Sequence, residues 1–306
     1  LIGEQFGFVR GIVDSPDLSL NISREMLQHD RQLKLIANNI EKKVKAELER
    51  LLKEDREGYE KFFQNFGRQL KVGCLNNYGA KRELLQDLLL FYSSTEKKMV
   101  TLGEYVDRMK EDQKYIYYAS GENAAAMDNL PQTELLRERN IEILYLTDQP
   151  DQLLVEILRQ YKDKEFRSAV DGDLGLEDVP EAKEADQEAQ DAFAFIKETL
   201  GDEVDEVRAS RKLKTHPVCL TSGEGVSFEM ERYFAVAQPE MGLKAKRILE
   251  VNTEHPAFAA LEAARTADPE KAKKYARVLL NQAKLIAGLP IDDPSGYTDL
   301  LCSLWS

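Results

Sequence analysis

The residue types that most often carry chemistry are spread along this sequence, and the usual catalytic groupings are not visible in it. The three histidines, His29, His216 and His255, each lack a second histidine or a cysteine at the spacing of metal ligands. A metal site is therefore not expected, and surface or helix-capping roles are the simplest assignment for all three. The sequence also contains no nucleophile elbow and no recognisable catalytic triad.

The cysteines give information about the redox environment. Cys74, Cys219 and Cys302 are odd in number and lie far apart. Such spacing indicates neither a disulfide framework nor a Cys-x-x-Cys metal site. Because unpaired thiols are typical of a reducing compartment, a cytoplasmic location is expected.

Two short segments resemble ligand-binding loops only in part. Residues 222–226, Ser-Gly-Glu-Gly-Val, fit neither the phosphate loop nor the dinucleotide fingerprint, so a turn between a strand and a helix is expected there. Residues 171–182 begin like a calcium loop, but Leu176 and Ala182 occupy the positions that require glycine and glutamate. Neither segment predicts a bound ion or nucleotide.

Arg24 is a residue that could act on a phosphoryl group. A guanidinium is always charged in proteins and can stabilise negative charge on a transferring phosphoryl group. Spacing alone favours a simpler role for Arg24, a surface ion pair in the first turn of a helix. Judged by its residues alone, the chain is a soluble two-domain protein without visible catalysis.

Composition bounds the class of protein. With 306 residues the chain is long enough for about two domains, and 42% hydrophobic with 32% charged residues is typical of globular proteins. The net charge of -13 opposes nucleic-acid binding and disfavours anionic membrane surfaces. The apolar run 88–92 is far shorter than the roughly 20 residues that span a bilayer. Neither nucleic acid nor a membrane is therefore expected as a partner.

Hydrophobic periodicity predicts an α/β first domain that begins with a long helical segment. Apolar residues recur every three or four positions from Arg31 to Glu54, which indicates one amphipathic helix, and a shorter helix follows to about Gly73. Strands then alternate with helices, which favours a small, mostly parallel sheet with helical covers, an αβα subdomain. The expected strands are 88–92, 115–119 and 142–146, and the expected helices are 102–109, further turns up to 139, and 153–161.

A run of acidic residues divides the chain. Between residues 171 and 191 there are nine acidic residues and one lysine, which is typical of a hydrated connection between domains. We expect a first domain at 1–175, an acidic connection at 176–188, and an α+β domain with a helical end at 189–306. Its expected helices are 193–200, 227–236, 255–266, 269–287 and 295–305, and its expected strands are 204–213, 218–221 and 247–251.

The helix at 227–236 has an apolar side that could bind other proteins. Methionine and aromatic side chains make adaptable contacts of large area, which suits varied partners. An amphipathic helix packs in a core more often than it binds a partner, and this alternative stays open. The residues concerned are Phe228, Met230, Tyr233 and Phe234, followed by Met241.

The last two expected helices predict a homodimer. The short connection 288–294 allows them to fold into an antiparallel hairpin. Two helices bury one seam but leave further apolar surface, which a two-fold related hairpin would cover. The expected interface residues are Tyr275, Leu279, Ile286, Leu300, Leu301, Leu304 and Trp305.

One long segment resembles a known protein family. Residues 8–28 read Phe-Val-Arg-Gly-Ile-Val-Asp-Ser-Pro-Asp-Leu-Ser-Leu-Asn-Ile-Ser-Arg-Glu-Met-Leu-Gln and closely resemble the middle-domain signature of the heat-shock protein 90 family. The similarity covers essentially the whole chain. It includes Asn-Phe-Gly at 65–67, Tyr-Tyr-Ala-Ser-Gly-Glu at 117–122, Met-Glu-Arg at 230–232 and Ile-Leu-Glu-Val-Asn at 248–252.

The resemblance implies that this chain takes part in ATP hydrolysis only together with an N-terminal domain that the sequence does not contain. In the family an N-terminal domain holds ATP and Mg, a middle domain completes the ATPase, and a C-terminal domain dimerises. The sequence starts as if cut inside a longer protein, so we expect a fragment that holds no cofactor and is not an ATPase alone. The resemblance assigns Arg24 to the ATP γ-phosphate and Gln28 to the role of its polar neighbour.

The resemblance also implies client proteins as partners. In the family the helix at 227–236 projects toward the cleft between protomers and touches clients, and paired C-terminal hairpins form a four-helix bundle. The chain departs from the pattern at Val226, often methionine in bacterial members, and at Leu153, tryptophan in some. The end of the sequence lacks the acidic Met-Glu-Glu-Val-Asp tail that docks eukaryotic co-chaperones. This resembles bacterial members, although a mitochondrial relative remains an alternative.

The expected function is thus a chaperone fragment that binds unfolded or partly folded clients and dimerises. A small α/β enzyme acting on a metabolite is one rival, which a convergent polar site in the first domain would favour. A purely structural dimerisation module is another rival. It would be favoured if exposed apolar surface were missing outside the C-terminal helices.

Overall fold

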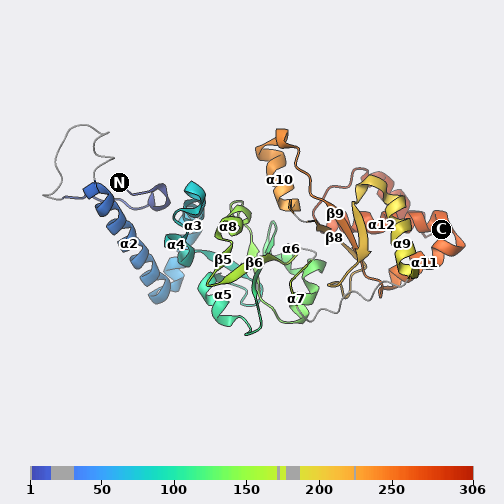
Figure 1. Ribbon diagram of the computed structural model, residues 1–306, viewed down its shortest axis with the longest axis horizontal. Coiled ribbons are helices and arrows are strands. Elements are labelled where there is room, and N and C mark those ends of the chain that lie inside the picture. The colour runs from blue at the N-terminus through green and yellow to red at the C-terminus, as the bar shows by residue number, and fades with distance from the viewer. Residues whose placement is uncertain (1, 15–30, 171–172, 177–186, 224, 306) are drawn as a thin grey trace. The chain divides into compact units, whose positions relative to one another are not determined.

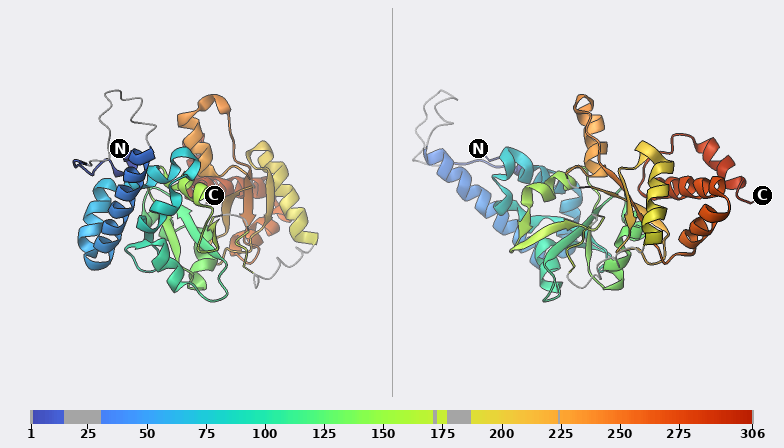
Figure 2. Two further views of the ribbon diagram at one scale, coloured as in Figure 1. Left: turned by 60° about the vertical axis from the view of Figure 1, so that its left-hand side comes forward. Right: turned by 45° about the vertical axis from the view of Figure 1, so that its right-hand side comes forward.

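The chain is shown as a computed structural model in Figures 1 and 2. Its helices and two sheets confirm the mixed class, α/β and α+β, that the sequence predicts. Among the residues that the structure describes, no helix is both long enough and apolar enough to cross a membrane. The described residues are 2–14, 31–170, 173–176, 187–223 and 225–305.

The chain divides into two compact units. The first unit comprises Leu1–Ile116 and Leu144–Phe166, and the second comprises Tyr117–Ile143 and Arg167–Ser306. The domain boundary expected at 176–188 stays a prediction, because most of that segment lies outside the described residues.

Two long helices begin the first unit, as the periodicity predicts. Helix α2 spans Arg31–Glu54, the expected bounds, and α3 spans Arg56–Gly79, several residues past the expected end. The carboxylate of Asp55 caps α3 by accepting the Gly58 N–H at 2.9 Å. The last turn of α3 is irregular, since Tyr78 has a φ of 55°, which L-residues with large side chains rarely adopt. Short turns flank this pair: η1 Glu4–Phe6, α4 Arg82–Leu85 and η2 Gln86–Leu88.

A six-stranded sheet follows, and the expectation of a mostly parallel sheet was wrong. Three of its five neighbouring pairs, β1–β2, β1–β4 and β5–β6, are antiparallel. The reason is local, because β5 and β6 are joined by the two-residue turn Lys162–Asp163, and so short a turn can only connect antiparallel strands. The strands, in the order β2-β1-β4-β3-β6-β5, are Met99–Thr101, Leu90–Ser93, Ile143–Leu146, Tyr115–Ser120, Lys164–Ser168 and Gln160–Tyr161.

Short helices connect these strands. Helix α5, Leu102–Arg108, starts with a capping box in which Thr101 Oγ1 accepts the Glu104 N–H at 3.0 Å and the Glu104 carboxylate accepts the Thr101 N–H at 2.8 Å. The helices expected near 102–109 and 153–161 are confirmed within a few residues. The remaining connecting helices are α6 Ala124–Asp128, η3 Pro131–Thr133, α7 Glu134–Glu138 and α8 Asp151–Leu158.

A three-stranded sheet organises the C-terminal part of the second unit. In the order β7-β9-β8, the central strand β9 pairs parallel with β7 and antiparallel with β8. Successive side chains of a strand point to opposite faces, and here one face carries Leu249 and Val251 into an apolar core. Helices α9 and α12 supply much of that core, including Ile196 and Leu280. The strands are β7 Glu206–Ala209, β8 Val218–Ser222 and β9 Arg247–Val251.

Most helices of this part agree with the expected ranges within three residues, but α9 begins at Gln187 rather than near Phe193. Figures 1 and 2 show α12 lying against the sheet, whereas α10 stands away from strands β8 and β9. The helices are α9 Gln187–Leu200, η4 Gly201–Glu203, α10 Phe228–Ala237, η5 Pro239–Met241, α11 Pro256–Ala267, α12 Pro269–Ile286 and α13 Pro294–Cys302.

Candidate functional site

Helix α10 presents apolar side chains to solvent. Ser227 caps it by accepting the Met230 N–H at 3.1 Å, so the glycine-containing segment before it is a strand-to-helix connection, as expected. Tyr233 is 50% exposed and Val236 is 86% exposed. Such exposure of large apolar side chains on one short helix is the usual mark of a binding surface.

The four residues expected on this surface have different environments. Phe228 is buried in the core of the second unit, so its side chain is not available to a partner. Met230 and Phe234 are half-buried, and the rings of Tyr233 and Phe234 meet edge to face at 5.3 Å. The strongly exposed Val236 was missed, although its spacing of three from Tyr233 places it on the same helix side.

The base of α10 is fixed by the start of β9. Arg247 donates a hydrogen bond to Glu231 Oε1 at 2.8 Å, and the Ala245 N–H donates to Glu231 Oε2 at 2.8 Å. The Arg247 guanidinium also lies over the Phe228 ring, 6.0 Å from its centre. The apolar surface therefore sits on a helix whose first two turns are held by polar contacts.

A second apolar surface lies on the C-terminal hairpin. Helix α13 has no buried residue, and Leu300, Leu301 and Leu304 are only half-buried. Trp305 is 84% exposed, and Leu285 at the end of α12 is 55% exposed. This leaves an apolar stripe at the end of the second unit.

The other expected interface residues lie deeper on α12. Leu279 is buried in the core of its own unit, and Tyr275 packs partly against that core. Ile286, near the end of α12, is half-buried. Residues available for an interface are thus concentrated at the end of α12 and on α13.

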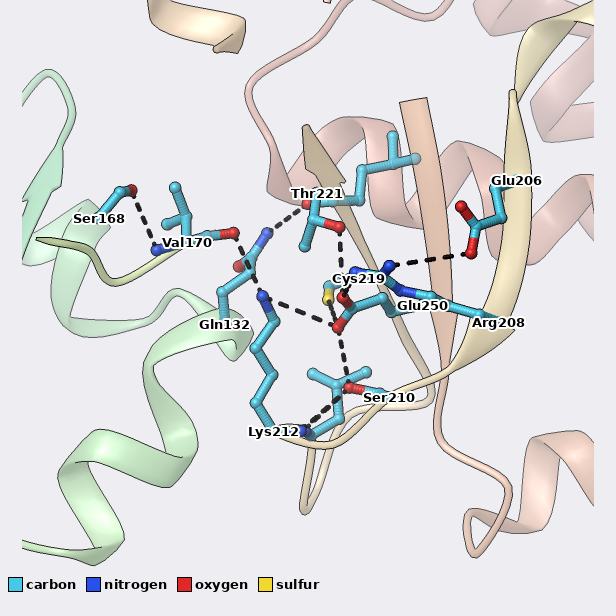
Figure 3. Close-up of polar contacts among 12 residues, drawn as sticks. Gln132, Ser168, Val170, Glu206, Arg208, Ser210, Lys212, Cys219, Thr221 and Glu250 are labelled. Carbon is cyan, nitrogen blue, oxygen red and sulfur yellow. Dashed lines mark hydrogen bonds and ion pairs between the residues drawn. The ribbon is translucent and has the colours of Figure 1, made fainter. Parts of the chain in front are cut away.

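The second face of the three-stranded sheet carries a buried polar network (Figure 3). Glu250 of β9 is 2% exposed, and its carboxylate accepts hydrogen bonds from Arg208 at 2.9 Å and Ser210 at 3.1 Å. Thr221 of β8 donates to the same carboxylate at 3.3 Å. Lys212, 1% exposed, places its ammonium 3.7 Å from Glu250 Oε2. The sequence carried a signal for this network, a charged residue within the apolar strand Ile-Leu-Glu-Val.

A second buried carboxylate lies at the start of α7. Glu134 accepts the N–H groups of Lys214 at 2.6 Å and Thr215 at 3.1 Å, and His216 Nδ1 lies 2.5 Å from its Oε1. Burial alone would raise the pKa of Glu134, but hydrogen bonds from Thr215, Lys214 and His216 outweigh it and lower the pKa to about 2. Glu134 therefore holds the loop that leads into β8.

The first unit contains its own buried charge cluster. The Lys71 ammonium on α3 lies 2.6 Å from Asp148 and 2.7 Å from Asp151 at the start of α8. It also lies 5.0 Å from the centre of the Phe91 ring. Burial raises the pKa of Asp151, an effect that Lys71 partly offsets. These contacts join α3 to the start of α8, so the geometry of the cluster supports a structural role.

Several expected residues cannot be placed. Arg24 and Gln28 lie outside the described residues, as do His29 and most of the calcium-like segment. His255 does cap a helix, since its Nδ1 accepts the Ala257 N–H at 3.1 Å, and this part of the expectation is confirmed. Across the described ranges, no group of three or more His, Cys, Asp or Glu residues is arranged to hold a metal ion.

Comparison with known proteins gives one consistent family. A family model described as "Hsp90 protein" matches residues 1–305. The chain is 53% identical to the "Chaperone protein HtpG" of Clostridium acetobutylicum over 305 residues, which are 99% of this chain and 49% of that protein. Proteins of the same description from Alkaliphilus metalliredigens and Bacillus subtilis are 53% and 50% identical, again with 49% of each covered. The chain spans about half the length of these relatives.

Proposed function

Because the chain belongs to the Hsp90 protein family, we propose that it forms the client-binding and dimerising part of a molecular chaperone. The relatives are described as chaperones, and about half of each lies outside the region that this chain matches. The apolar surface of α10 is the observation that carries the proposal. A cytoplasmic location belongs to the same proposal and agrees with the three free cysteines.

Client contact is assigned to the outward side of α10 and to η5. Tyr233, Val236 and Met241 are each at least half exposed, and Met230 and Phe234 add half-buried apolar surface beside them. Unfolded chains expose apolar side chains, so burial against this surface would provide the binding free energy. Methionine and aromatic side chains adapt to partners of different shape, which suits a protein with many clients.

This surface also favours the chaperone over a purely structural dimerisation module. That rival requires exposed apolar side chains to be confined to the C-terminal helices. Val236, 86% exposed, lies outside those helices, as does Met241. The other rival, a small metabolic enzyme, gains no support from the charge cluster of Lys71, whose contacts join two helices.

Dimerisation is assigned to the ends of α12 and α13. A helix of nine residues such as α13 is too short to be stable in isolation, and it has no buried residue in the single chain. A second copy of the hairpin would cover Leu301, Leu304 and Trp305 and so complete the packing of α13. We propose the half-buried and exposed residues of this stripe as the homodimer interface.

ATP hydrolysis is proposed only for the longer protein. ATP and Mg would be held by the part of the relatives that this chain does not match. Arg24 is proposed to stabilise charge on the γ-phosphoryl group, with Gln28 as its polar neighbour, as the family resemblance implies. In a full-length protein, Arg24→Ala should therefore lower turnover far more than ATP affinity.

Photo-crosslinking tests the proposed client surface. A photoreactive amino acid at Val236 should crosslink to an unfolded client, whereas the same group at exposed Lys271 on α12 should not. Equal crosslinking from both positions would show that binding is nonspecific and would remove α10 from its role.

A further inference from the structure

The buried network around Glu250 lies where the strands that carry α10 meet two segments from earlier in the chain (Figure 3). Strand β8 ends at Ser222, five residues before the cap of α10, and β9 begins at Arg247, which holds Glu231 of α10. Gly223 also donates its N–H to the carbonyl of Lys246 at 3.2 Å. The ends of β8 and β9 therefore form the platform on which α10 stands.

The network ties together all three strands of this platform. Glu250 is on the central strand β9, Thr221 and Cys219 are on β8, and Arg208 is on β7. Cys219 Sγ lies 3.9 Å from the Glu250 carboxylate, and burial raises the pKa of that thiol. One carboxylate thus links each strand of the sheet.

Two further contacts connect the platform to the earlier segments. The Lys212 ammonium donates to the carbonyl of Val170 at 3.2 Å, just after β6. The Gln132 amide in η3, which is 2% exposed, donates to the carbonyl of Leu220 on β8 at 2.9 Å. All these residues belong to the second unit. Segment 131–134 is therefore joined to β8, the strand that leads into α10, and segment 168–170 is joined through Lys212 to Glu250 on β9.

Because these contacts are buried and include charged groups, the connection that they form is either intact or broken. Lys212 and Glu250 are almost fully buried, so separating them would leave an uncompensated charge in an apolar surrounding. Apolar surfaces can slide past one another at little cost, whereas buried charged hydrogen bonds are either made or broken. Because buried ion pairs add little stability compared with apolar packing, their retention points to a role in fixing one arrangement.

We propose that Lys212, Glu250 and Gln132 couple the segments 131–134 and 168–170 to α10, so that the order of α10 depends on the position of those segments. The coupling rests on the proposed function only in the purpose that we assign to it, which is control of the client surface. The coupling itself concerns the chain without a client. A displacement of segment 131–134 breaks the contact of Gln132 with β8, and a displacement of segment 168–170 breaks the contact of Val170 with Lys212. Either change loosens the platform of α10.

Hydrogen exchange of backbone amides tests the coupling in the 306-residue chain. Lys212→Met should speed exchange in α10 by about tenfold or more, with a change of less than about twofold in α12. Gln132→Met breaks the other contact and should have the same effect on α10. Lys214→Met is the control, because Lys214 lies on the same loop but is half exposed and pairs with exposed Glu138 at 3.5 Å.

A second variant covers the case in which Lys212→Met destabilises the whole unit. Lys212→Met with Glu250→Gln removes both charges, so no buried charge is left without a partner. Faster exchange in α10 with α12 unchanged in this double variant supports the coupling. Equal acceleration of α10 and α12, or exchange in α10 like that of the parent, overturns it. If α10 exchanges faster but client binding is unchanged, the coupling stands and the client role of α10 fails.

Discussion

The ammonium of Lys71 lies 2.7 Å from the carboxylate of Asp151, and both side chains are almost completely removed from solvent. The contact joins α3 to the start of α8 across 80 residues of sequence. Removal of Lys71 would leave the Asp151 carboxylate buried without a cation, so the pair fixes how these two helices pack in the first unit.

We therefore expect Lys71→Met to destabilise the first unit by about 3–5 kcal/mol. Lys61→Met on the same helix should change stability by less than about 0.5 kcal/mol, because Lys61 pairs with Glu57 at the surface. Denaturant-dependent hydrogen exchange at α3 measures the change in stability caused by each substitution. Lys71→Met combined with Asp151→Leu should recover much of the loss, and a double variant as unstable as the single one would contradict this account.

The low pKa of Glu134 predicts acid sensitivity in the second unit. A carboxyl whose pKa falls from 4.5 to about 2 on folding contributes stability above about pH 4.5, and this is lost as the pH falls toward 2. Glu134→Gln should remove that part of the pH dependence. The unfolding midpoints of the parent and of Glu134→Gln, measured between pH 6 and pH 3, test this. If the midpoints of both proteins change equally with pH, Glu134 does not contribute to the pH dependence.

The cysteines should differ in reactivity. Burial raises the pKa of Cys74 to about 12 and raises that of Cys219 as well, so few thiolates form at either position at pH 8. Cys302 is exposed in the single chain, so its thiol should react. One thiol per native chain should react with a disulfide reagent, and none in Cys302→Ser. Rapid reaction of a second thiol would contradict the burial of Cys74 and Cys219.

Dimerisation should depend on the apolar stripe of α13. Leu301→Asp would place a charge in the proposed interface and weaken association by about 2 kcal/mol or more, roughly 30-fold. Ser295→Asp, at an exposed position six residues earlier on a different side of the same helix, is the matched control. Light scattering should give twice the chain mass of 34.9 kDa for the parent and the control, but a single chain for Leu301→Asp at low micromolar concentration. A parent that stays monomeric at tens of micromolar would show that the stripe is not a dimer interface.

Sequence periodicity predicted helices and strands better than it predicted their pairing. The bounds of α2 and β9 were predicted correctly: α2 has a regular helical apolar pattern, and β9 has a short apolar run that Glu250 interrupts. The antiparallel pairs of the six-stranded sheet were missed, because β5 has only two residues and such short strands carry no readable alternation. Strand pairing also depends on turns. Lys162 and Asp163 form this turn with positive φ, but they are not the glycine or asparagine residues by which such a turn is usually predicted.

For the candidate surfaces too, the sequence pattern predicted the helix but not how the helix packs. Helical spacing predicted α10 as amphipathic, but it could not show that Phe228 faces the core while Val236 faces solvent. That distinction depends on Arg247 and Glu231, which fix the rotation of the helix through contacts distant in sequence. The contacts of the buried network could not be predicted either, since Lys212 meets Glu250, and Gln132 meets Leu220, only in the folded chain.

The binding of an unfolded client to α10 tests the central claim most directly. Tyr233→Ser with Val236→Ser removes the two most exposed apolar side chains of the helix, and neither belongs to the core of the second unit. Fluorescence anisotropy with a labelled, permanently unfolded protein should give a Kd at least about tenfold weaker for this variant, with an unchanged Tm. An unchanged Kd in a variant that folds normally would contradict the account.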